Sequence, residues 1–151
     1  MARTYSIANT AAVGSASYHQ LCIYMATAAG VRPRIFEFGL SSSASPADQS
    51  SRYLIAYSST GAPTGGTAPT IGTLDPGDPA ALATSRAGAT GGETMGNTLY
   101  MISVNLRASF RWVAAPTKEF VVANTQYAGC GIQVAAQSAA YNVDTCLVWE
   151  E

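Results

Sequence analysis

Hydrophobic and polar positions alternate most regularly in residues 99–114. There the apolar side chains recur at every second position, while polar or charged side chains fall between them; the apolar set is Val104, Leu106, Ala108, Phe110 and Trp112. A period of two residues is typical of a β-strand with one buried face. The pattern therefore predicts one strand over residues 99–114, which Pro116 ends.

Residues 34–40 show the same alternation on a smaller scale. Phe36, Phe38 and Leu40 share one predicted face, which leaves Glu37 on the other, outward face. Two further segments, residues 17–27 and 52–58, mix aromatic and β-branched residues without helical spacing of their polar positions. Both are predicted to be strands.

Shorter strands are predicted in the last third of the chain, over residues 119–123, 132–136 and 145–149, with Gly129 and Gly131 as turn residues. Seven or eight short strands without intervening helices predict an all-β fold, an antiparallel β-sandwich or jelly-roll-like domain. A chain of 151 residues is near the usual size of one domain, so we expect residues 1–151 to form a single β-sandwich domain.

The segment of about residues 59–98 breaks this pattern. It is rich in Gly and Thr, contains four of the prolines, and has few large apolar residues. We expect one long Gly/Pro-rich loop arm here, because structureless loops of this length are functional or disordered. A partner contact and a mobile surface loop are both open interpretations. Within the arm, a helical turn could begin at Asp78, or residues 75–78 could form a tight turn. For residues 75–78, a tight turn fits the sequence better than a calcium site.

Charged residues make up only 11% of the chain, less than half of the usual share. A surface of small uncharged residues favours contact with other proteins, although such residues also fill ordinary loops. The net charge of −1 and the scattered arginines disfavour nucleic-acid binding. We expect no membrane segment and no secretory leader, and hence synthesis in a cytoplasm.

Residues that could perform chemistry are few and scattered. His19, the single histidine, lies in a predicted strand without a recognisable nucleophile or acid beside it, so we expect a hydrogen-bonded strand histidine and no catalytic residue. The odd number of cysteines, without close spacing, predicts reduced thiols, and whether Cys130 and Cys146 are bridged is left open. No metal site or cofactor is predicted. The many aromatic residues would suit sugar stacking, but Trp112 is predicted to be core.

Four parts of the chain carry a family resemblance: residues 2–6 (ARTYS), residues 65–69 and 74–81 (GGTAP and LDPGDPAA), residues 110–116 with Phe110, Arg111, Trp112 and Pro116, and residues 147–150 (LVWE). With these, the chain resembles small virion accessory proteins of tailed bacteriophages, similar to capsid decoration (cement, head-stabilising) proteins. The resemblance implies a structural virion protein, not an enzyme, that binds the outer surface of a phage head and stabilises it. It would be made in the cytoplasm of the host bacterium and located on the capsid surface.

The implied partners are the phage major capsid protein and further copies of the chain, with a homotrimer favoured, and neither nucleic acid nor membrane. The expected contact residues are Arg3, Tyr5, Pro63, Pro69, Leu74, Asp75, Pro76 and Arg111. Deleting residues 63–92 is expected to leave a folded domain that no longer binds heads. The alternative functions are a tail tube or connector subunit and a receptor- or carbohydrate-binding module of the tail.

Overall fold

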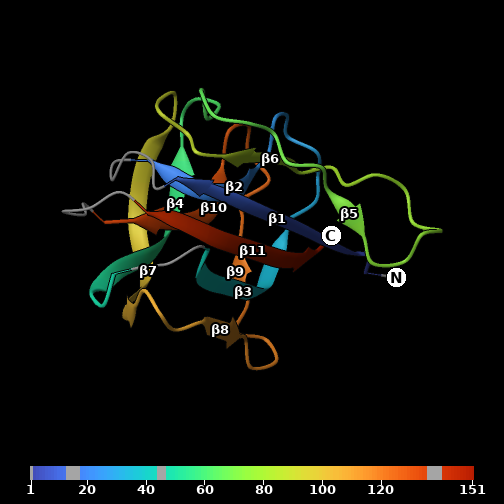
Figure 1. Ribbon diagram of the computed structural model, residues 1–151. Coiled ribbons are helices and arrows are strands. Elements are labelled where there is room, and N and C mark those ends of the chain that lie inside the picture. Colours follow the sequence, from blue (N-terminus) through green and yellow to red (C-terminus); the bar gives the residue numbers. More distant parts are fainter. Residues whose placement is uncertain (1, 13–17, 44–46, 136–140) are drawn as a thin grey trace.

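The computed structural model describes residues 2–12, 18–43, 47–135 and 141–151. Within these ranges the chain forms eleven β-strands and no helix. The strands make two antiparallel sheets that pack face to face (Figure 1). The predicted all-β antiparallel sandwich is therefore confirmed, with more strands than the seven or eight expected.

Each sheet is described by its strand order. Sheet A consists, in order, of β5 (Gly72–Thr73), β1 (Thr4–Ala12), β11 (Asn142–Glu150), β3 (Arg34–Ser43) and β8 (Phe110–Val113), and β9 (Phe120–Val121) also pairs with β3. Sheet B consists, in order, of β6 (Thr84–Ala87), β2 (His19–Tyr24), β10 (Gly129–Val134), β4 (Ser50–Ser59) and β7 (Thr94–Asn105).

The principal strands pair in a nested order. β1 pairs with β11, β2 with β10, β3 with β8 and β4 with β7, always antiparallel. Because β1 and β3 belong to sheet A whereas β2 and β4 belong to sheet B, the chain crosses from one sheet to the other at each step. Strands β11 and β10 then complete the centres of the two sheets by pairing with β3 and β4 as well.

The core lies between the inner faces of the two sheets. Along β11, every second residue from Val143 to Trp149 is buried, as expected for a strand with one face against a core. Sheet B contributes Leu21, Ile23 and Ile132, all almost fully buried. The burial of these apolar side chains is the main force that holds the sandwich together.

Residues 99–114 form two strands and not the single strand predicted. β7 ends at Asn105 in sheet B, and β8 begins at Phe110 in sheet A. Between them, the Asn105 side-chain oxygen accepts the Arg107 N–H at 2.9 Å, and the Asn105 carbonyl accepts the Ala108 N–H at 2.9 Å. The apolar alternation continues through this turn because both strands face the same core, so the pattern alone could not reveal the break.

β3 contains a bulge, and because of it the residues on its buried face differ in part from those predicted. Val148 pairs with Glu37 but the next residue, Trp149, pairs with Ile35, so Phe36 is an extra residue in β3. An extra residue reverses the alternation on its two sides. The buried residues are consequently Ile35, Phe38 and Leu40, whereas Phe36 is partly exposed. Glu37 lies on the outward face, as predicted.

The prediction of two glycines as turn residues is also wrong. Gly129 and Gly131 lie inside β10 and not in turns. A Cβ atom on Gly131 would lie 2.4 Å from the Cβ atom of Cys22 on the neighbouring strand, so close strand contact explains that glycine. β1 was not predicted at all, and positions 17 and 136, at the ends of two predicted strands, lie outside the described residues.

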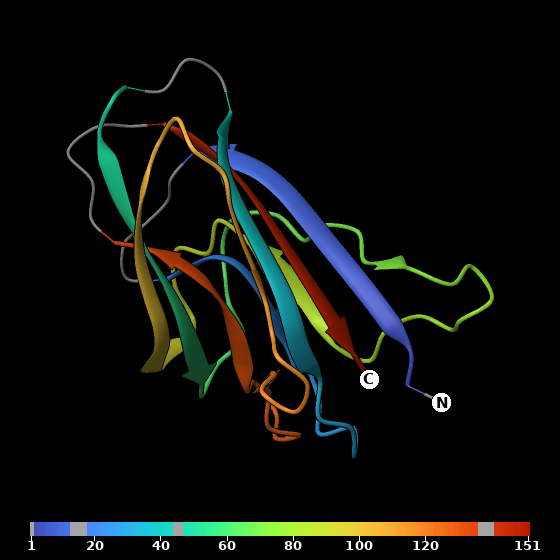
Figure 2. The ribbon, with the colours of Figure 1, turned by 90° about the horizontal axis from the view of Figure 1, so that it is seen from below.

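The predicted arm is folded onto the sandwich over much of its length. We call residues 61–93 the arm and residues 74–82 its tip. Bridges between Thr64 and Gly91 and between Thr67 and Ala87 join the two limbs of the arm. β5 pairs with β1 at the edge of sheet A, and the loop that carries β5 extends beyond the rest of the two sheets, on the side of both termini (Figure 2). A tight turn from Asp75 to Asp78 closes the tip, so the turn is confirmed and the helical turn from Asp78 is wrong.

The arm also completes the sandwich, which corrects the expected result of deleting it. β6 pairs with β2 along the edge of sheet B, and Ala83, Ser85 and Ala87 are buried there. Removal of residues 63–92 would expose the backbone of β2 and this part of the core. We therefore expect such a deletion to unfold the protein, so only changes at the tip can separate binding from folding.

Two glycines of the arm provide a matched test of how closely its limbs approach. Gly66 and Gly88 have nearly the same φ, +62° and +64°, but a Cβ atom on Gly66 would lie 1.9 Å from the Ala87 carbonyl oxygen, whereas one on Gly88 meets nothing closer than 3.9 Å. We expect Gly88→Ala to cost about 1–2 kcal/mol of unfolding free energy from its backbone conformation, and Gly66→Ala at least about 1 kcal/mol more from overpacking. Urea denaturation measures both; equal losses would contradict the close approach.

Candidate functional site

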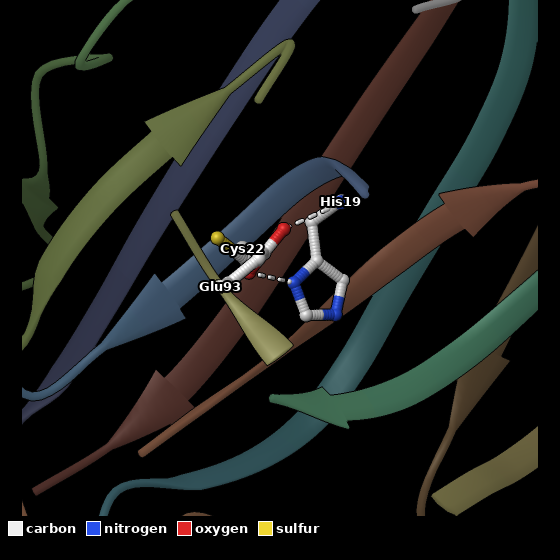
Figure 3. Close-up of side chains that lie close together, drawn as sticks. All are labelled: His19, Cys22 and Glu93. Carbon is white, nitrogen blue, oxygen red and sulfur yellow. Dashed lines mark hydrogen bonds and ion pairs between the residues drawn. The ribbon is translucent and has the colours of Figure 1, made fainter. Parts of the chain in front are cut away.

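A buried ion pair joins the arm to sheet B (Figure 3). His19 is the first residue of β2, and Glu93 directly precedes β7 at the end of the arm. The His19 ring atom Nδ1 lies 2.8 Å from Oε2 of Glu93, and the His19 backbone N–H donates to Oε1 at 2.8 Å. Neither side chain has any solvent-exposed surface. One carboxylate thus holds both the ring and the backbone of His19.

The hydrogen bonds define where the protons are. The other ring nitrogen, Nε2, lies 2.9 Å from the carbonyl oxygen of Ala56, which can only accept, so Nε2 carries a hydrogen. Burial alone would raise the pKa of Glu93, but the hydrogen bonds and the charge of His19 outweigh it and lower that pKa. Because Nε2 carries one hydrogen, the contact of 2.8 Å between Nδ1 and Oε2 needs a second one, so the His19–Glu93 pair shares a proton and has no net charge.

Cys22 is the third member of the cluster. A ligand atom of each of His19, Cys22 and Glu93 lies within 4.8 Å of the other two. Residues three apart on a regular strand point to opposite faces, but a register shift opposite Ile132 and Gln133 adds one residue to β2. Figure 3 shows the His19 and Cys22 side chains on either side of the Glu93 carboxylate.

A thiol, an imidazole and a carboxylate are also the groups of a nucleophilic cysteine site. Here the thiol is not activated: burial, together with the charge of Glu93, raises the pKa of Cys22 well above its ordinary value. The ring nitrogen Nε2 is already bonded to Ala56, and all three residues are buried. In this conformation no substrate can reach the cluster, which instead links two distant parts of the chain.

The sequence singled out His19 but not its partner, and Cys22 was expected only to be one of three reduced thiols. His19 is a hydrogen-bonded strand histidine, as expected. Glu93 was missed because it is 74 residues away in a segment expected to be a loop. The one signal available was a lone carboxylate next to Gly91 and Gly92, in a part of the chain with few charges.

All three cysteines are free thiols, and Cys130 and Cys146 lie in different sheets, so they are not bridged. Burial raises the pKa of Cys130 to about 12 and also raises the pKa of Cys146, which is only partly buried.

We expect native-state labelling with a thiol reagent at pH 8 to modify Cys146 slowly and to leave Cys22 and Cys130 unmodified, because only a thiolate that reaches solvent reacts. In denaturant, all three should react. Mass spectrometry of the labelled protein gives the count. Rapid native labelling of Cys22 would show that the arm does not seal the cluster.

A second candidate site is a groove of about 450 Å³ on the outer face of sheet A, lined by residues of β1, β3, β8 and β11. At one side the Arg111 guanidinium donates two hydrogen bonds to the Glu37 carboxylate, at 2.7 and 2.8 Å, and these lower the pKa of Glu37. Asp144 accepts hydrogen bonds from Thr10 and Ser41. The groove therefore offers paired charges and hydroxyl groups to a polar ligand.

The expected contact residues fall in different places. Leu74, Asp75 and Pro76 are exposed in the tip, and Arg3 is exposed beside it, 3.8 Å from Asp78. Pro69 is partly buried between the tip and the limbs.

The other three expected contact residues are not exposed at or near the tip. Tyr5 is 1% exposed, with its hydroxyl donating to the Pro79 carbonyl, and Pro63 is buried, so the structure corrects both as surface contacts. Arg111 lies in the groove on sheet A, away from the tip.

Comparison of the chain with protein-family models, with curated proteins and with solved structures finds no match. In the part of the chain that the structure describes, no helix has the length and hydropathy needed to cross a membrane.

Proposed function

We propose that this chain is a non-enzymatic virion protein that decorates the outer surface of a phage head, binds the major capsid protein through the tip of its arm and stabilises the shell. The observation that carries the proposal is an exposed apolar tip held in a fixed position. Leu74 and Leu82, both in the tip, are 55% and 52% exposed, and are two of the few large apolar side chains so exposed among the described residues. Exposed apolar side chains on an anchored loop are suited to docking.

The anchoring of the tip supports this role. The Glu151 carboxylate accepts the backbone N–H groups of Leu82 and Ala83 at 2.7 and 2.9 Å. On the other side, the hydroxyl of the buried Tyr5 donates to the Pro79 carbonyl at 3.2 Å. A loop that is already ordered loses less conformational entropy when it binds, so more of the contact energy appears as affinity.

The strand order supports a jelly roll, which we propose as the finer description of the sandwich. Numbered along the chain without β5, β6 and β9, the remaining eight strands pair 1 with 8, 2 with 7, 3 with 6 and 4 with 5. A jelly roll is such a folded-over antiparallel ribbon, and viral capsid proteins and lectins use it. Because one fold serves many functions, this agreement is secondary to the tip.

The edge of sheet B supports self-association. β7 is the edge strand, twelve residues long, and contains neither a charged residue nor proline, two of the usual means of protecting an edge, although its pairing with β4 shifts register twice. Another copy of the chain could extend the sheet there through backbone hydrogen bonds. We keep the homotrimer as the favoured oligomer, which light scattering coupled to gel filtration would measure.

The copy number of the protein in purified particles tests the proposed function. Many copies spread over the shell, seen by mass spectrometry and electron microscopy, would support decoration of the head. A few copies at one vertex or along the tail would instead identify a tail tube or connector subunit. Absence from particles would rule out both.

Substitution of the two exposed leucines tests the tip itself. We expect the double change Leu74→Ser and Leu82→Ser to weaken binding to heads by about 10-fold or more, since each buried leucine contributes about 1.5–3 kcal/mol, while the unfolding free energy changes by less than about 0.5 kcal/mol. Co-sedimentation with heads gives the affinity. Val113→Ser, at a similarly exposed position on β8, is the control and should bind normally.

The groove on sheet A favours a second candidate, a carbohydrate-binding module of the tail. Besides Arg111 and Asp144, it offers the side-chain amide nitrogen of Asn9, which is buried without a hydrogen-bond partner in the described structure. Such a donor, near charged groups, suits sugar hydroxyls. Binding on a glycan array that is lost in Arg111→Ala but kept in the tip variant would favour this function over decoration.

A further inference from the structure

The cluster beneath the arm contains three residue types that bind zinc. Histidine nitrogen, cysteine sulfur and a carboxylate oxygen are the usual protein ligands of Zn²⁺. In a tetrahedral site with metal–ligand bonds of about 2.0–2.3 Å, the ligand atoms lie roughly 3.3–3.7 Å apart. Those of His19, Cys22 and Glu93 already lie within 4.8 Å of one another. Shifts of about an ångström would convert the hydrogen-bonded cluster into a set of metal ligands.

The charges of the cluster allow this exchange. In the described state, the hydrogen-bonded pair of His19 and Glu93 has no net charge, and Cys22 is a free thiol. A divalent cation would replace two protons, one from Nδ1 of His19 and one from Sγ of Cys22. The bound state then has an M²⁺ ion, a thiolate, a carboxylate and a neutral imidazole, again with no net charge. Because neither state leaves an uncompensated charge in the buried site, burial does not oppose the exchange of two protons for the metal ion.

Two neighbouring groups support a metal site. The Nε2–H group of His19 donates to the Ala56 carbonyl, which is how metal-bound histidines are usually oriented by a second hydrogen bond. Ser58 is only 4% exposed, and its hydroxyl lies near enough to the Glu93 carboxylate to help lower the pKa of that group. Within the described ranges, this hydroxyl has no hydrogen-bond partner of good geometry. This hydroxyl is therefore available for a hydrogen bond to a metal-bound water.

We propose that His19, Cys22 and Glu93 form a binding site for a divalent zinc-class metal ion, which fastens the end of the arm to β2. Because the site is fully buried, the metal enters while the chain folds and not afterwards. The metal site does not depend on the proposed phage function, because the copy number in particles and the binding of a metal are independent measurements.

Refolding with Co²⁺, a spectroscopic substitute for Zn²⁺, tests the site. The protein is unfolded in guanidinium with EDTA, exchanged into metal-free denaturant and refolded with Co²⁺, and unbound metal is removed by gel filtration. We expect about one cobalt ion per chain and a thiolate-to-cobalt charge-transfer absorption. Refolding with Zn²⁺ should raise the denaturation midpoint relative to refolding with EDTA, because a ligand of the native state stabilises it.

Variants identify the thiol. The double change Cys130→Ala and Cys146→Ser leaves Cys22 as the single thiol and should keep the absorption band, whereas Cys22→Ser should lose it and bind metal at least about 10-fold more weakly. Circular dichroism verifies folding of each variant, and the double variant remains informative even if Cys22→Ser does not fold. Refolded wild-type protein without bound metal and without the band, or a band that disappears in the double variant, would overturn the proposal.

Discussion

Replacing Glu93 with alanine is expected to lower the free energy of unfolding by about 3–5 kcal/mol, measured by urea denaturation in the presence of EDTA. The change leaves Nδ1 of the His19 ring without its hydrogen-bond partner in a site that has no solvent exposure. Loss of one member of a buried pair carries this large cost because the remaining polar group is left unpaired away from water. It also removes the acceptor of the His19 backbone N–H group.

Two controls define the origin of this effect. The double change His19→Leu and Glu93→Leu removes both members of the pair and should destabilise the protein less than Glu93→Ala alone. Glu37→Ala removes the carboxylate of a pair whose arginine is exposed, and its effect should be much smaller. An unfolding free energy for Glu93→Ala within about 1 kcal/mol of the wild type would show that the pair does not hold the arm.

Trp149→Ala is expected to cost a comparable 3–5 kcal/mol, the usual range for removing a large aromatic side chain from a core. Trp149 has no exposed surface, its ring lies 5.7 Å from that of Tyr5, and its Nε1–H donates to Glu151 at 3.0 Å. The substitution leaves a cavity and also frees the Glu151 carboxylate that holds the tip.

Guanidinium denaturation, followed by the fluorescence of Trp112, measures this loss. Trp149→Phe should keep much of the stability, because the phenyl ring fills most of the space. Trp112→Ala, followed by the fluorescence of Trp149, should cost less, since Trp112 is only partly buried. If Trp149→Ala were no more harmful than Trp112→Ala, this result would contradict the complete burial of Trp149 in the core between the two sheets.

The fold class could be predicted because alternation reports which residues face a core. It correctly indicated β2, β4 and the C-terminal part of β11. It could not show the crossing from sheet B to sheet A after Asn105, since both strands face the same interior. Nor could it show the bulge at Phe36, which is defined by pairing with β11. β1 was missed because its small and polar residues, such as Ala8 and Thr10, lack a strong apolar alternation.

The candidate site was harder to predict than the fold. A histidine and a cysteine three residues apart on a strand would ordinarily face opposite ways, and only a register shift places them together. Glu93 reaches them because the arm returns to the sheet, and the return depends on the glycines at which its limbs meet. Such contacts arise from tertiary pairing, which local sequence patterns do not encode.

The placement of the last strands has a consequence for how the protein is made. β11 lies between β1 and β3, and β10 lies between β2 and β4, so the middle strand of each sheet comes from the final quarter of the described chain. On the ribosome, β1 to β4 emerge long before the strands that join them. Neither sheet can close until residues 129–150 have been synthesised, and until then the nascent chain must keep four unpaired strand edges from aggregating.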